Sequence, residues 1–297
     1  MSRSSIVLLF SFLSLAANAQ RDSLRSSELN DQAVLWLILE DYQKALVTLD
    51  SAILFDSLNA QAYGNRSAAW DGLGVFDEAL LNVNKAISID SLNAAHYYNR
   101  GLLLKNNYQY YRSALDFKKA INLDPKHLLS INKLAYYYFE FKEDYDSCKK
   151  VIEDYMWYGT TKTKKDADLI GLYGYLKMKE GDLQGAITEF DLAISIDSTS
   201  AEAYFNRGLV YYKLKRYKPS IADYSKAIEL GRSAPQTHYN RALSYEYLRD
   251  FESAIDDYDQ ELKMHGATAN AFNNRGRCFM ILNQFQPAYD DYMRALE

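Results

Sequence analysis

The sequence is poor in residues that interrupt regular structure, with 4 prolines and 13 glycines in 297 residues. Proline breaks the interior of a helix and glycine weakens it, so their scarcity argues against a loop-rich or disordered chain. Apolar residues make up 48% of the chain, as in a folded protein, and the 26 tyrosines are an unusual excess. Because alanine, leucine, lysine and glutamate are abundant, we expect the regular elements to be helices.

Catalytic and metal-binding patterns are also lacking. No glycine-rich phosphate loop, nucleophile elbow or His-Glu-x-x-His helix occurs. The adjacent carboxylates Asp256-Asp257 and Asp290-Asp291 would point about 100° apart on a helix, which favours a solvated face or an ion pair over acid–base chemistry. The four histidines show no ligand spacing with cysteines or carboxylates. The sequence therefore predicts no enzyme, no metal site and no cofactor.

Positive charge is in deficit, because 34 Lys and Arg residues face 39 Asp and Glu residues, for a net charge of −5. Nucleic-acid phosphates require a basic surface, so we expect no nucleic-acid partner. The chain also lacks a basic amphipathic stretch that would bind anionic membranes.

Long apolar runs are absent except for residues 6–15, which follow Arg3 and precede Ala17-Asn18-Ala19. This pattern predicts a secretory signal over residues 1–19, cleaved before Gln20. The alternative, an uncleaved membrane anchor, needs about 17 or more apolar residues, and this run is shorter. The absence of a cysteine after the run argues against a lipid-attached lipoprotein. The signal, ending in Ala-Gln, is similar to those of exported Bacteroidetes proteins. We therefore expect a periplasmic or secreted protein with a short linker at residues 20–25 and no integral membrane segment after cleavage.

A five-residue motif recurs at a period of 34 residues. It reads Tyr204-Phe205-Asn206-Arg207-Gly208 and returns at residues 238–242 and 272–276, with counterparts at 63–67 and 97–101. The period predicts repeats that begin near residues 26, 60, 94, 128, 167, 201, 235 and 269.

Small residues stand at three positions of these repeats. Position 8 is Ala33, Ser67, Gly101, Ala135, Gly174, Gly208, Ala242 and Gly276, and position 20 is Ala45, Ala79, Ser113, Ser147, Ala186, Ser220, Ala254 and Ala288. Position 27 is alanine except for Asp154 and Glu261. Apolar residues between them recur at helical spacing, so each repeat is expected to be a hairpin of two closely packed helices.

This pattern resembles the tetratricopeptide repeat over residues 26–297. The resemblance implies an all-α fold, an α-α superhelix of eight helix-turn-helix repeats whose first helices line a concave groove that binds peptides or partner proteins. Repeat 4 departs from the pattern by five extra residues, which we expect in a loop or lengthened turn over residues 155–168. The last repeat carries no polar capping helix, which predicts a partner contact, a homo-oligomer such as a dimer through that end, or poor solubility.

An arginine at position 7 accompanies Asp or Asn at position 23. We expect four ion pairs across the hairpins: Arg100 with Asp116, Arg207 with Asp223, Arg241 with Asp257 and Arg275 with Asp291. Direct ligand binding by these arginines is the alternative.

Cys148 and Cys278 lie about four repeats apart, too far for a disulfide, and we expect both thiols to be free and buried.

Asparagine at position 6 would face the groove in the tetratricopeptide repeat. Asn65, Asn99, Asn206, Asn240 and Asn274 would then form a ladder. The ladder resembles the one that lines the repeat domain of the enzyme that attaches N-acetylglucosamine to serine and threonine, where the amides hold a peptide's main chain. The alternative is that asparagine simply tolerates a solvated helix position. The chaperone-tail clamp of some family members needs lysines and asparagines that no three consecutive repeats supply here.

Aromatic residues occupy groove-type positions in repeats 3 to 5. Tyr98, Tyr136, Phe139 and Tyr175 are candidates for side-chain pockets, or they pack between neighbouring helices.

The sequence therefore favours an exported, non-enzymatic scaffold that binds an extended peptide or partner protein in its groove. The alternatives are an assembly subunit of a cell-envelope complex that uses its convex face and C-terminal end, and an enzyme with a glycan or peptidoglycan substrate, which only the compartment suggests.

Overall fold

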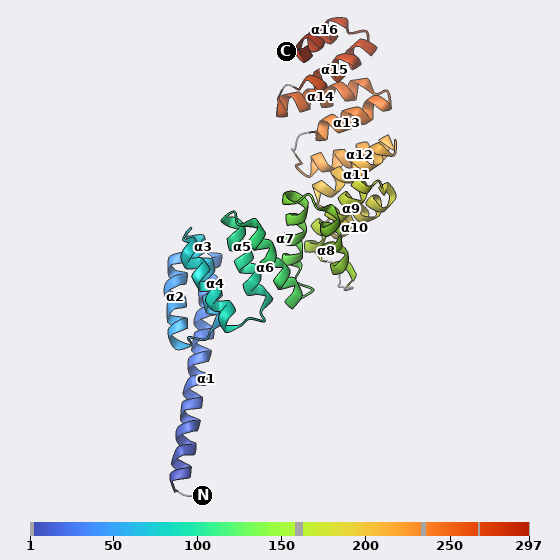
Figure 1. Cartoon of the computed structure of the whole chain (residues 1–297). Helices are drawn as coiled ribbons and strands as arrows, with labels where there is room; N and C mark the ends of the chain where they lie inside the picture. The colour runs from blue at the N-terminus through green and yellow to red at the C-terminus, as the bar shows by residue number, and fades with distance from the viewer. Residues whose placement is uncertain (1–2, 158–162, 233–235, 267, 297) are drawn as a thin grey trace. The chain divides into compact units, whose positions relative to one another are not determined.

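The computed structural model describes residues 3–157, 163–232, 236–266 and 268–296. These residues form 16 α-helices and no strand, which confirms the expected all-α fold of stacked helical repeats (Figure 1). The chain divides into two compact units, Met1–Tyr158 and Gly159–Glu297, here called the first and second units.

The first unit contains four helical hairpins. Its elements are α1 (Arg3–Ile38), α2 (Tyr42–Phe55), α3 (Ala60–Gly72), α4 (Phe76–Ile89), α5 (Ala94–Asn106), α6 (Tyr110–Leu123), α7 (Leu128–Tyr136), a π-helical turn (Tyr137–Phe141) and α8 (Tyr145–Trp157). Each odd-numbered helix packs against the even-numbered helix that follows it, and successive hairpins pack through α2 and α3, α4 and α5, and α6 and α7. The first helices α1, α3 and α5 also contact one another in order, so they form one layer.

The second unit repeats this arrangement. Its elements are a short 3-10 helix (Lys164–Asp166), α9 (Ala167–Glu180), α10 (Leu183–Ile196), α11 (Ala201–Lys213), α12 (Tyr217–Glu229), α13 (Thr237–Tyr247), α14 (Phe251–His265), α15 (Ala269–Ile281) and α16 (Phe285–Leu296). The first helices α9, α11 and α13 again contact one another in order. Helices begin at six of the predicted repeat starts; the start at residue 235 lies outside the described residues.

Helix starts follow the expected capping chemistry. The side chains of Asn59 and Asn93 accept backbone hydrogen bonds of 3.0 Å in the first turns of α3 and α5, and Ser200 does the same for α11 at 3.4 Å. These bonds satisfy amide groups that have no partner within the helix. The hairpins turn through a left-handed residue, for example Gly74 (φ 74°) or Lys215 (φ 58°). The 34-residue period thus fixes both the entry to the first helix and the turn into the second.

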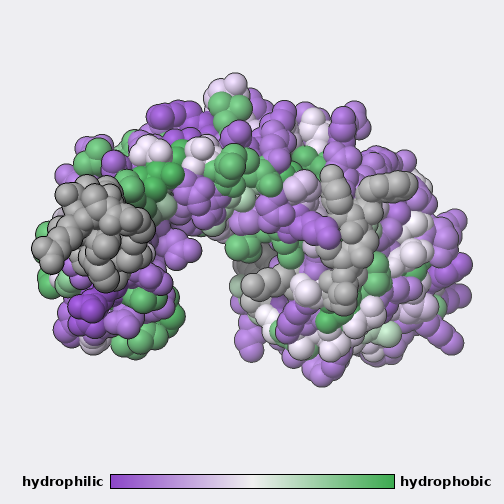
Figure 2. Space-filling view, turned by 90° about the horizontal axis from the view of Figure 1, so that it is seen from below, coloured by the Kyte–Doolittle hydropathy of each residue, from purple (hydrophilic) through white to green (hydrophobic). Residues whose placement is uncertain are grey.

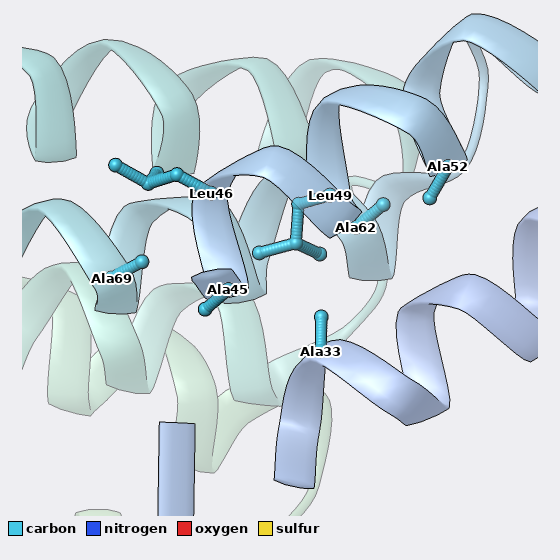
Figure 3. Packing of buried hydrophobic residues seen from close by; sticks show 7 residues of the cluster. All are labelled: Ala33, Ala45, Leu46, Leu49, Ala52, Ala62 and Ala69. Atoms are coloured by element: carbon cyan, nitrogen blue, oxygen red, sulfur yellow. The ribbon is translucent and has the colours of Figure 1, made fainter. Parts of the chain in front are cut away.

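Alanine and leucine side chains fill the space between the helices. In the first unit, Ala33, Ala45 and Ala62 from α1, α2 and α3 lie around the fully buried Leu49, and Ala69 of α3 belongs to the same cluster (Figure 3). Because alanine adds only a methyl group, the helices approach closely enough for one leucine to fill the gap between them.

Glycine at position 8 has a more specific role, since each such glycine faces a ring at position 24. A Cβ atom added to Gly208 would lie 2.9 Å from Cε1 of Tyr224, and one added to Gly101 would lie 2.6 Å from Cε1 of Phe117. Gly174 and Gly276 face Phe190 and Tyr292 in the same way. The absent side chain therefore makes room for an aromatic ring from the second helix.

One of the five extra residues of repeat 4 lies before α8, which corrects the expectation that all five fall in a loop or turn over residues 155–168. This residue is absorbed by the π-helical turn Tyr137–Phe141, and α8 begins one residue later than the 34-residue register predicts. The buried residue at the predicted position 20 is accordingly Cys148 and not Ser147, and Tyr155 replaces Asp154 inside the hairpin. Tyr155 to Trp157 continue α8; residues 158–162 lie outside the described residues.

Helix α1 is continuous from Arg3 to Ile38, so residues 3–19 of the predicted signal and the linker expected at residues 20–25 are helical and continue into the first helix of repeat 1. None of the helices in the described part of the chain has the length and apolar character that a membrane span requires. On the face shown in Figure 2, hydrophobic residues form separate patches in a largely hydrophilic surface.

Two glycines provide a matched test of the close helix crossings. Gly208→Ala forces its Cβ against the Tyr224 ring, whereas Gly171→Ala meets nothing within 4 Å. We expect Gly208→Ala to lower the free energy of unfolding by about 1–3 kcal/mol through overpacking, and Gly171→Ala to raise it by about 0.5–1 kcal/mol through helix propensity. Urea unfolding followed by circular dichroism measures both. Equal effects would contradict the proposed role of Gly208.

Two histidines of the first unit are expected to make it acid-labile. His96 is buried with no partner for its Nε2 atom within the described residues, and burial lowers the pKa of His96 and of His127 despite the nearby carboxylates Asp90 and Asp124. The unfolded chain binds protons first as the pH falls below about 6.5, so stability is fully present above that pH and falls below it.

We expect His96→Phe to flatten this loss, by up to about 1.4 kcal/mol per pH unit. The measurement is the free energy of unfolding between pH 7.5 and about 5.5, above the main titration of Asp and Glu. An identical pH profile in the variant would show that His96 does not contribute.

Candidate groove pocket and arginine bridges

The predicted arginine–aspartate pairs all lie within ion-pair distance. In each pair the arginine Nε donates to one carboxylate oxygen and Nη2 to the other, at 2.6–2.8 Å. The four pairs are Arg100–Asp116, Arg207–Asp223, Arg241–Asp257 and Arg275–Asp291. The carboxylates are buried and the guanidinium groups are partly buried. Such two-point geometry holds the first helix at a fixed angle to the second.

The same arginines make a second contact that sequence reasoning missed. Nη1 of Arg207 donates to Asp191 at 2.6 Å, and Nη1 of Arg241 donates to Ser225 at 2.8 Å. Arg66, Arg100 and Arg275 likewise reach Asp50, Asn84 and Asp259. Each acceptor lies on the second helix of the preceding repeat, sixteen residues before the arginine. We call this three-helix contact the arginine bridge.

Repeats 4 and 5 lack the arginine, and the residues that would contact it differ as well. Leu134 stands in the arginine position of repeat 4, and sixteen residues before it is Lys118, which cannot accept a hydrogen bond. In repeat 5, Lys177 instead pairs with Glu189 across the hairpin at 2.7 Å. The signal that would have revealed the second contact is therefore the acceptor sixteen residues upstream.

The electrostatics of one bridge show how the charges are balanced. Burial would raise the pKa of the Asp257 carboxyl, but the hydrogen bonds and charges of Arg241 and His238 outweigh it and hold the pKa below its usual value. The pKa of Arg241 is raised although its burial acts in the opposite direction, because Asp257 stabilises the cation. The pair is therefore ionised at neutral pH.

In the second unit, a cavity of about 440 Å³ lies on the layer of first helices. It is lined by Tyr212 of α11, by Leu243, Glu246 and Tyr247 of α13, and by Asn274 and Arg277 of α15. These residues come from positions 6, 9, 12 and 13 of three consecutive repeats. The cavity, here called the groove pocket, therefore lies where the repeat pattern places the concave surface.

A fixed ion pair forms the polar side of the groove pocket. The Arg277 Nη2 donates to Glu246 Oε2, and Glu246 Oε1 accepts a 2.5 Å hydrogen bond from the Tyr258 hydroxyl. The Glu246 side chain is only 9% exposed while that of Arg277 is 51% exposed. Glu246 thus holds the Arg277 guanidinium in place, and part of the guanidinium surface remains open to a ligand.

The neighbouring thiol is not a reactive group. Cys278 is buried, and burial, with Glu246 nearby, raises the pKa of its thiol to about 12. Cys148, in the first unit, is also buried, unpaired and raised in pKa by burial. Both thiols remain protonated at neutral pH. Among the described residues, no three His, Cys, Asp or Glu side chains are grouped in a way that could hold a metal ion.

Tyr212 and Tyr247 form the aromatic side of the groove pocket, and Tyr217 packs against both rings. The rings of Tyr217 and Tyr247 stack at 4.6 Å with an angle of 2°, and Tyr212 meets both edge-on at 5.8 Å. Burial and the hydrogen bond to Tyr247 raise the pKa of Tyr212, so its phenol stays neutral. Tyr247 remains 59% exposed, which presents a flat ring next to Arg277.

The five asparagines of the predicted ladder differ in whether their side chains are hydrogen-bonded to the protein. The Nδ2 atoms of Asn65 and Asn274 donate to Asn30 Oδ1 at 2.8 Å and to the Tyr239 hydroxyl at 2.9 Å, each at position 5 of the preceding repeat. Asn206 is buried and donates to Glu202 at 3.3 Å. Within the described residues, the amides of Asn99 and Asn240 make no side-chain hydrogen bond to the protein. The amides of Asn65 and Asn274 therefore join helices, that of Asn206 bonds within α11, and those of Asn99 and Asn240 keep all their donors and acceptors.

The predicted aromatic residues are also divided. Tyr98 packs against Phe117 and His127 at ring distances of 5.9 and 5.3 Å, and Tyr175 packs on the core of α9, α10 and α11. Phe139 contacts Tyr145 at 5.7 Å, while Tyr136 lines a cavity. Packing thus accounts for Tyr98 and Tyr175, and Tyr136 is the candidate that reaches a cavity. Tyr212 and Tyr247, the groove-pocket rings, were not among the predicted residues.

Family models of known proteins match four stretches of the chain. A model described as "TPR repeat" matches residues 174–215, and three described as "Tetratricopeptide repeat" match residues 95–127, 201–233 and 239–297. No curated protein sequence matches the chain.

Solved structures agree in fold. The C-terminal part of a TPR repeat-containing protein from Cytophaga hutchinsonii aligns with a TM-score of 0.62 at 15% identity, covering 82% of this chain and 98% of its own. A tetratricopeptide repeat protein from Parabacteroides merdae gives 0.54 at 14% identity, covering 92% and 100%. YrrB, a TPR protein with an unusual peptide-binding site, gives 0.52 at 21% identity, covering 62% and 92%.

A double-mutant cycle tests the arginine bridge. We expect Arg241→Leu to cost about 3–5 kcal/mol of unfolding free energy, because it leaves the buried Asp257 carboxylate without its cation. Asp257→Leu should cost less, since the arginine retains Ser225 and solvent. The two changes combined should cost clearly less than their sum, as measured by urea unfolding. Additive effects would mean that the two charges do not act together.

The helical repeats, the matched family models and the solved structures agree, and the chain therefore carries tetratricopeptide repeats and has the fold of the proteins built from them.

Proposed function

We propose that the protein is an exported, non-enzymatic scaffold that binds an extended segment of a partner protein in the groove of its second unit. The observation that carries the proposal is the groove pocket, in which an exposed tyrosine, a partly open guanidinium and an apolar side chain meet. The tetratricopeptide fold supports protein–protein interaction in general, and YrrB, described as having an unusual peptide-binding site, is a protein of this fold that binds peptides.

The lining groups of the groove pocket and the neighbouring Asn240 offer different contacts to a peptide. Asn240 lies on the same face of α13 as Leu243 and Tyr247, at helical spacing of three and seven residues. Its carboxamide can donate to and accept from one peptide unit, whatever the side chains of the ligand. Arg277, held by Glu246, can donate to a backbone carbonyl or a carboxylate. Tyr247 provides a ring of the kind that dominates protein interfaces.

Export is supported by the sequence of residues 1–19, with its basic start, apolar run and Ala-Asn-Ala site. Mass spectrometry of the protein recovered from a culture of its source would give the mature N-terminus. A protein that begins at Gln20 supports export; a protein that retains Met1 or Ser2 rules out cleavage.

A second function, assembly through the convex face, is favoured by one specific observation. Val47, Leu81 and Leu115 occupy the same position on α2, α4 and α6 of the first unit, and all three are exposed. An apolar row of this kind is a candidate protein contact. The apolar side chains Phe285, Tyr289 and Leu296 on α16, also exposed, are candidates for a contact between copies of the chain.

Selection of a displayed random peptide library on the full chain tests the groove. For the best selected peptide, we expect Tyr247→Ala to weaken binding about tenfold or more, as for a central interface tyrosine, and Asn240→Ala to weaken it about two- to tenfold through one or two lost hydrogen bonds. Fluorescence anisotropy of the labelled peptide measures the affinity.

The matched control is Tyr289→Ala, because Tyr289 and Tyr247 are 60% and 59% exposed and only Tyr247 lies in the groove pocket. Tyr289→Ala should leave the affinity unchanged. If peptide binding persists in Tyr247→Ala but is lost in Leu81→Ser, the convex face is the binding surface and the groove proposal is wrong.

A further inference from the structure

The π-helical turn of the first unit builds an aromatic wall. π-helical turns are rare single-turn insertions that occur frequently at functional sites, and here the turn Tyr137–Phe141 carries Phe141 against Tyr110 of α6. The two rings stack with centroids 4.2 Å apart and an angle of 26°. Tyr137 lies 6.2 Å from Phe141 at a similar tilt. The inserted residue therefore gives this hairpin a stacked pair that the 34-residue register does not provide.

A cavity of about 210 Å³ lies beside this wall. Its apolar lining comes from Tyr110, Phe117, Tyr136, Tyr137 and Phe141. An engineered cavity of about 150 Å³ with an apolar lining is large enough to bind benzene. The cavity of the first unit therefore has room for one phenyl ring, with aromatic faces and edges around it.

Unpaired positive charge stands at the rim of the cavity. Lys105 of α5 and Lys133 of α7 line it and are half-buried. Among the described residues, neither ammonium group has a carboxylate within ion-pair distance, and Glu140, also at the rim, pairs with neither. Two ammonium groups against one carboxylate make this a basic spot on a chain whose net charge is −5. A half-buried ammonium without a counter-ion is stabilised by an incoming anion.

We propose that this cavity binds an aromatic side chain of a partner protein, with a carboxylate beside that side chain paired to Lys105 and Lys133. The lining provides the space and the apolar contact, and the two lysines provide the charge complement. The inference rests on the proposed function in one respect, namely that the partner is a protein. The site itself lies in the first unit and shares no residue with the groove pocket of the second.

The probe that isolates this chemistry is 3-phenylpropionate, which joins a phenyl ring to a carboxylate. Titrated into the full chain and followed by NMR, it should bind in the millimolar range. Replacing the carboxylate by a carboxamide, in 3-phenylpropanamide, should weaken binding about tenfold, since charge-assisted hydrogen bonds are lost. Propionate, which lacks the ring, should give no saturable binding. Equal binding of the carboxylate and the carboxamide would overturn the proposal without any variant.

The double variant Lys105→Met, Lys133→Met should weaken the binding of 3-phenylpropionate about tenfold. It should leave the affinity for 3-phenylpropanamide unchanged, because methionine keeps the length and apolar stem of each side chain. Lys150→Met, at an exposed position of α8, is the matched control and should change neither affinity. If the double variant binds 3-phenylpropionate like the original protein, the ring or the carboxylate binds elsewhere and the site is wrong.

Tyr247→Ala separates this inference from the proposed function. The groove-pocket variant should lose affinity for the selected peptide and keep its affinity for 3-phenylpropionate. Loss of 3-phenylpropionate binding in Tyr247→Ala would place the probe in the second unit and overturn the inference, whereas failure of peptide selection with intact, lysine-dependent probe binding would count against the groove proposal alone.

Discussion

The arginine bridge is the interaction that sets the stacking angle of the repeats that contain it. A helical hairpin has no intrinsic reason to stack at one angle on the next, because small apolar residues pack in several registers. One guanidinium group that donates to its own hairpin through Nε and Nη2, and to the preceding hairpin through Nη1, removes that freedom. Partly buried charges carry a desolvation cost, so geometric specificity is the stronger reason for them to recur.

The groove pocket follows from this constraint. Once the second helices are fixed by the bridges, positions 6, 9, 12 and 13 of successive first helices face one surface at a constant spacing. Tyr212, Glu246 and Arg277 meet because α11, α13 and α15 are held in that series. The pocket itself depends on the side chains that happen to occupy these positions, which is why one scaffold can accommodate different ligands.

The sequence predicts the regular part of this structure well, for a physical reason. Helix starts, turns and the four arginine–aspartate pairs repeat with the chain, so each repeat serves as a comparison for the others. The asparagine ladder shows the limit of that reasoning. Asn65 and Asn99 occupy the same position of their repeats. Position 5 of the preceding repeat is Asn30 in one case and Gly64 in the other, and only Asn30 has a side chain that can accept a hydrogen bond. The role of a groove residue depends on its spatial neighbour as well as on its position.

Departures from the repeat could not be placed from the sequence. Five extra residues in repeat 4 are visible as a count, but the count does not say where a helix will absorb them. In a repeat fold each hairpin contacts only its neighbours, so one residue can be taken up as a π-helical turn without disturbing the hairpins farther along. Phe141 then reaches Tyr110, and the lysines at the rim of the adjacent cavity stay unpaired. A regular array offers the same surface at every step, and a break in its register is where one hairpin acquires a site that its neighbours lack.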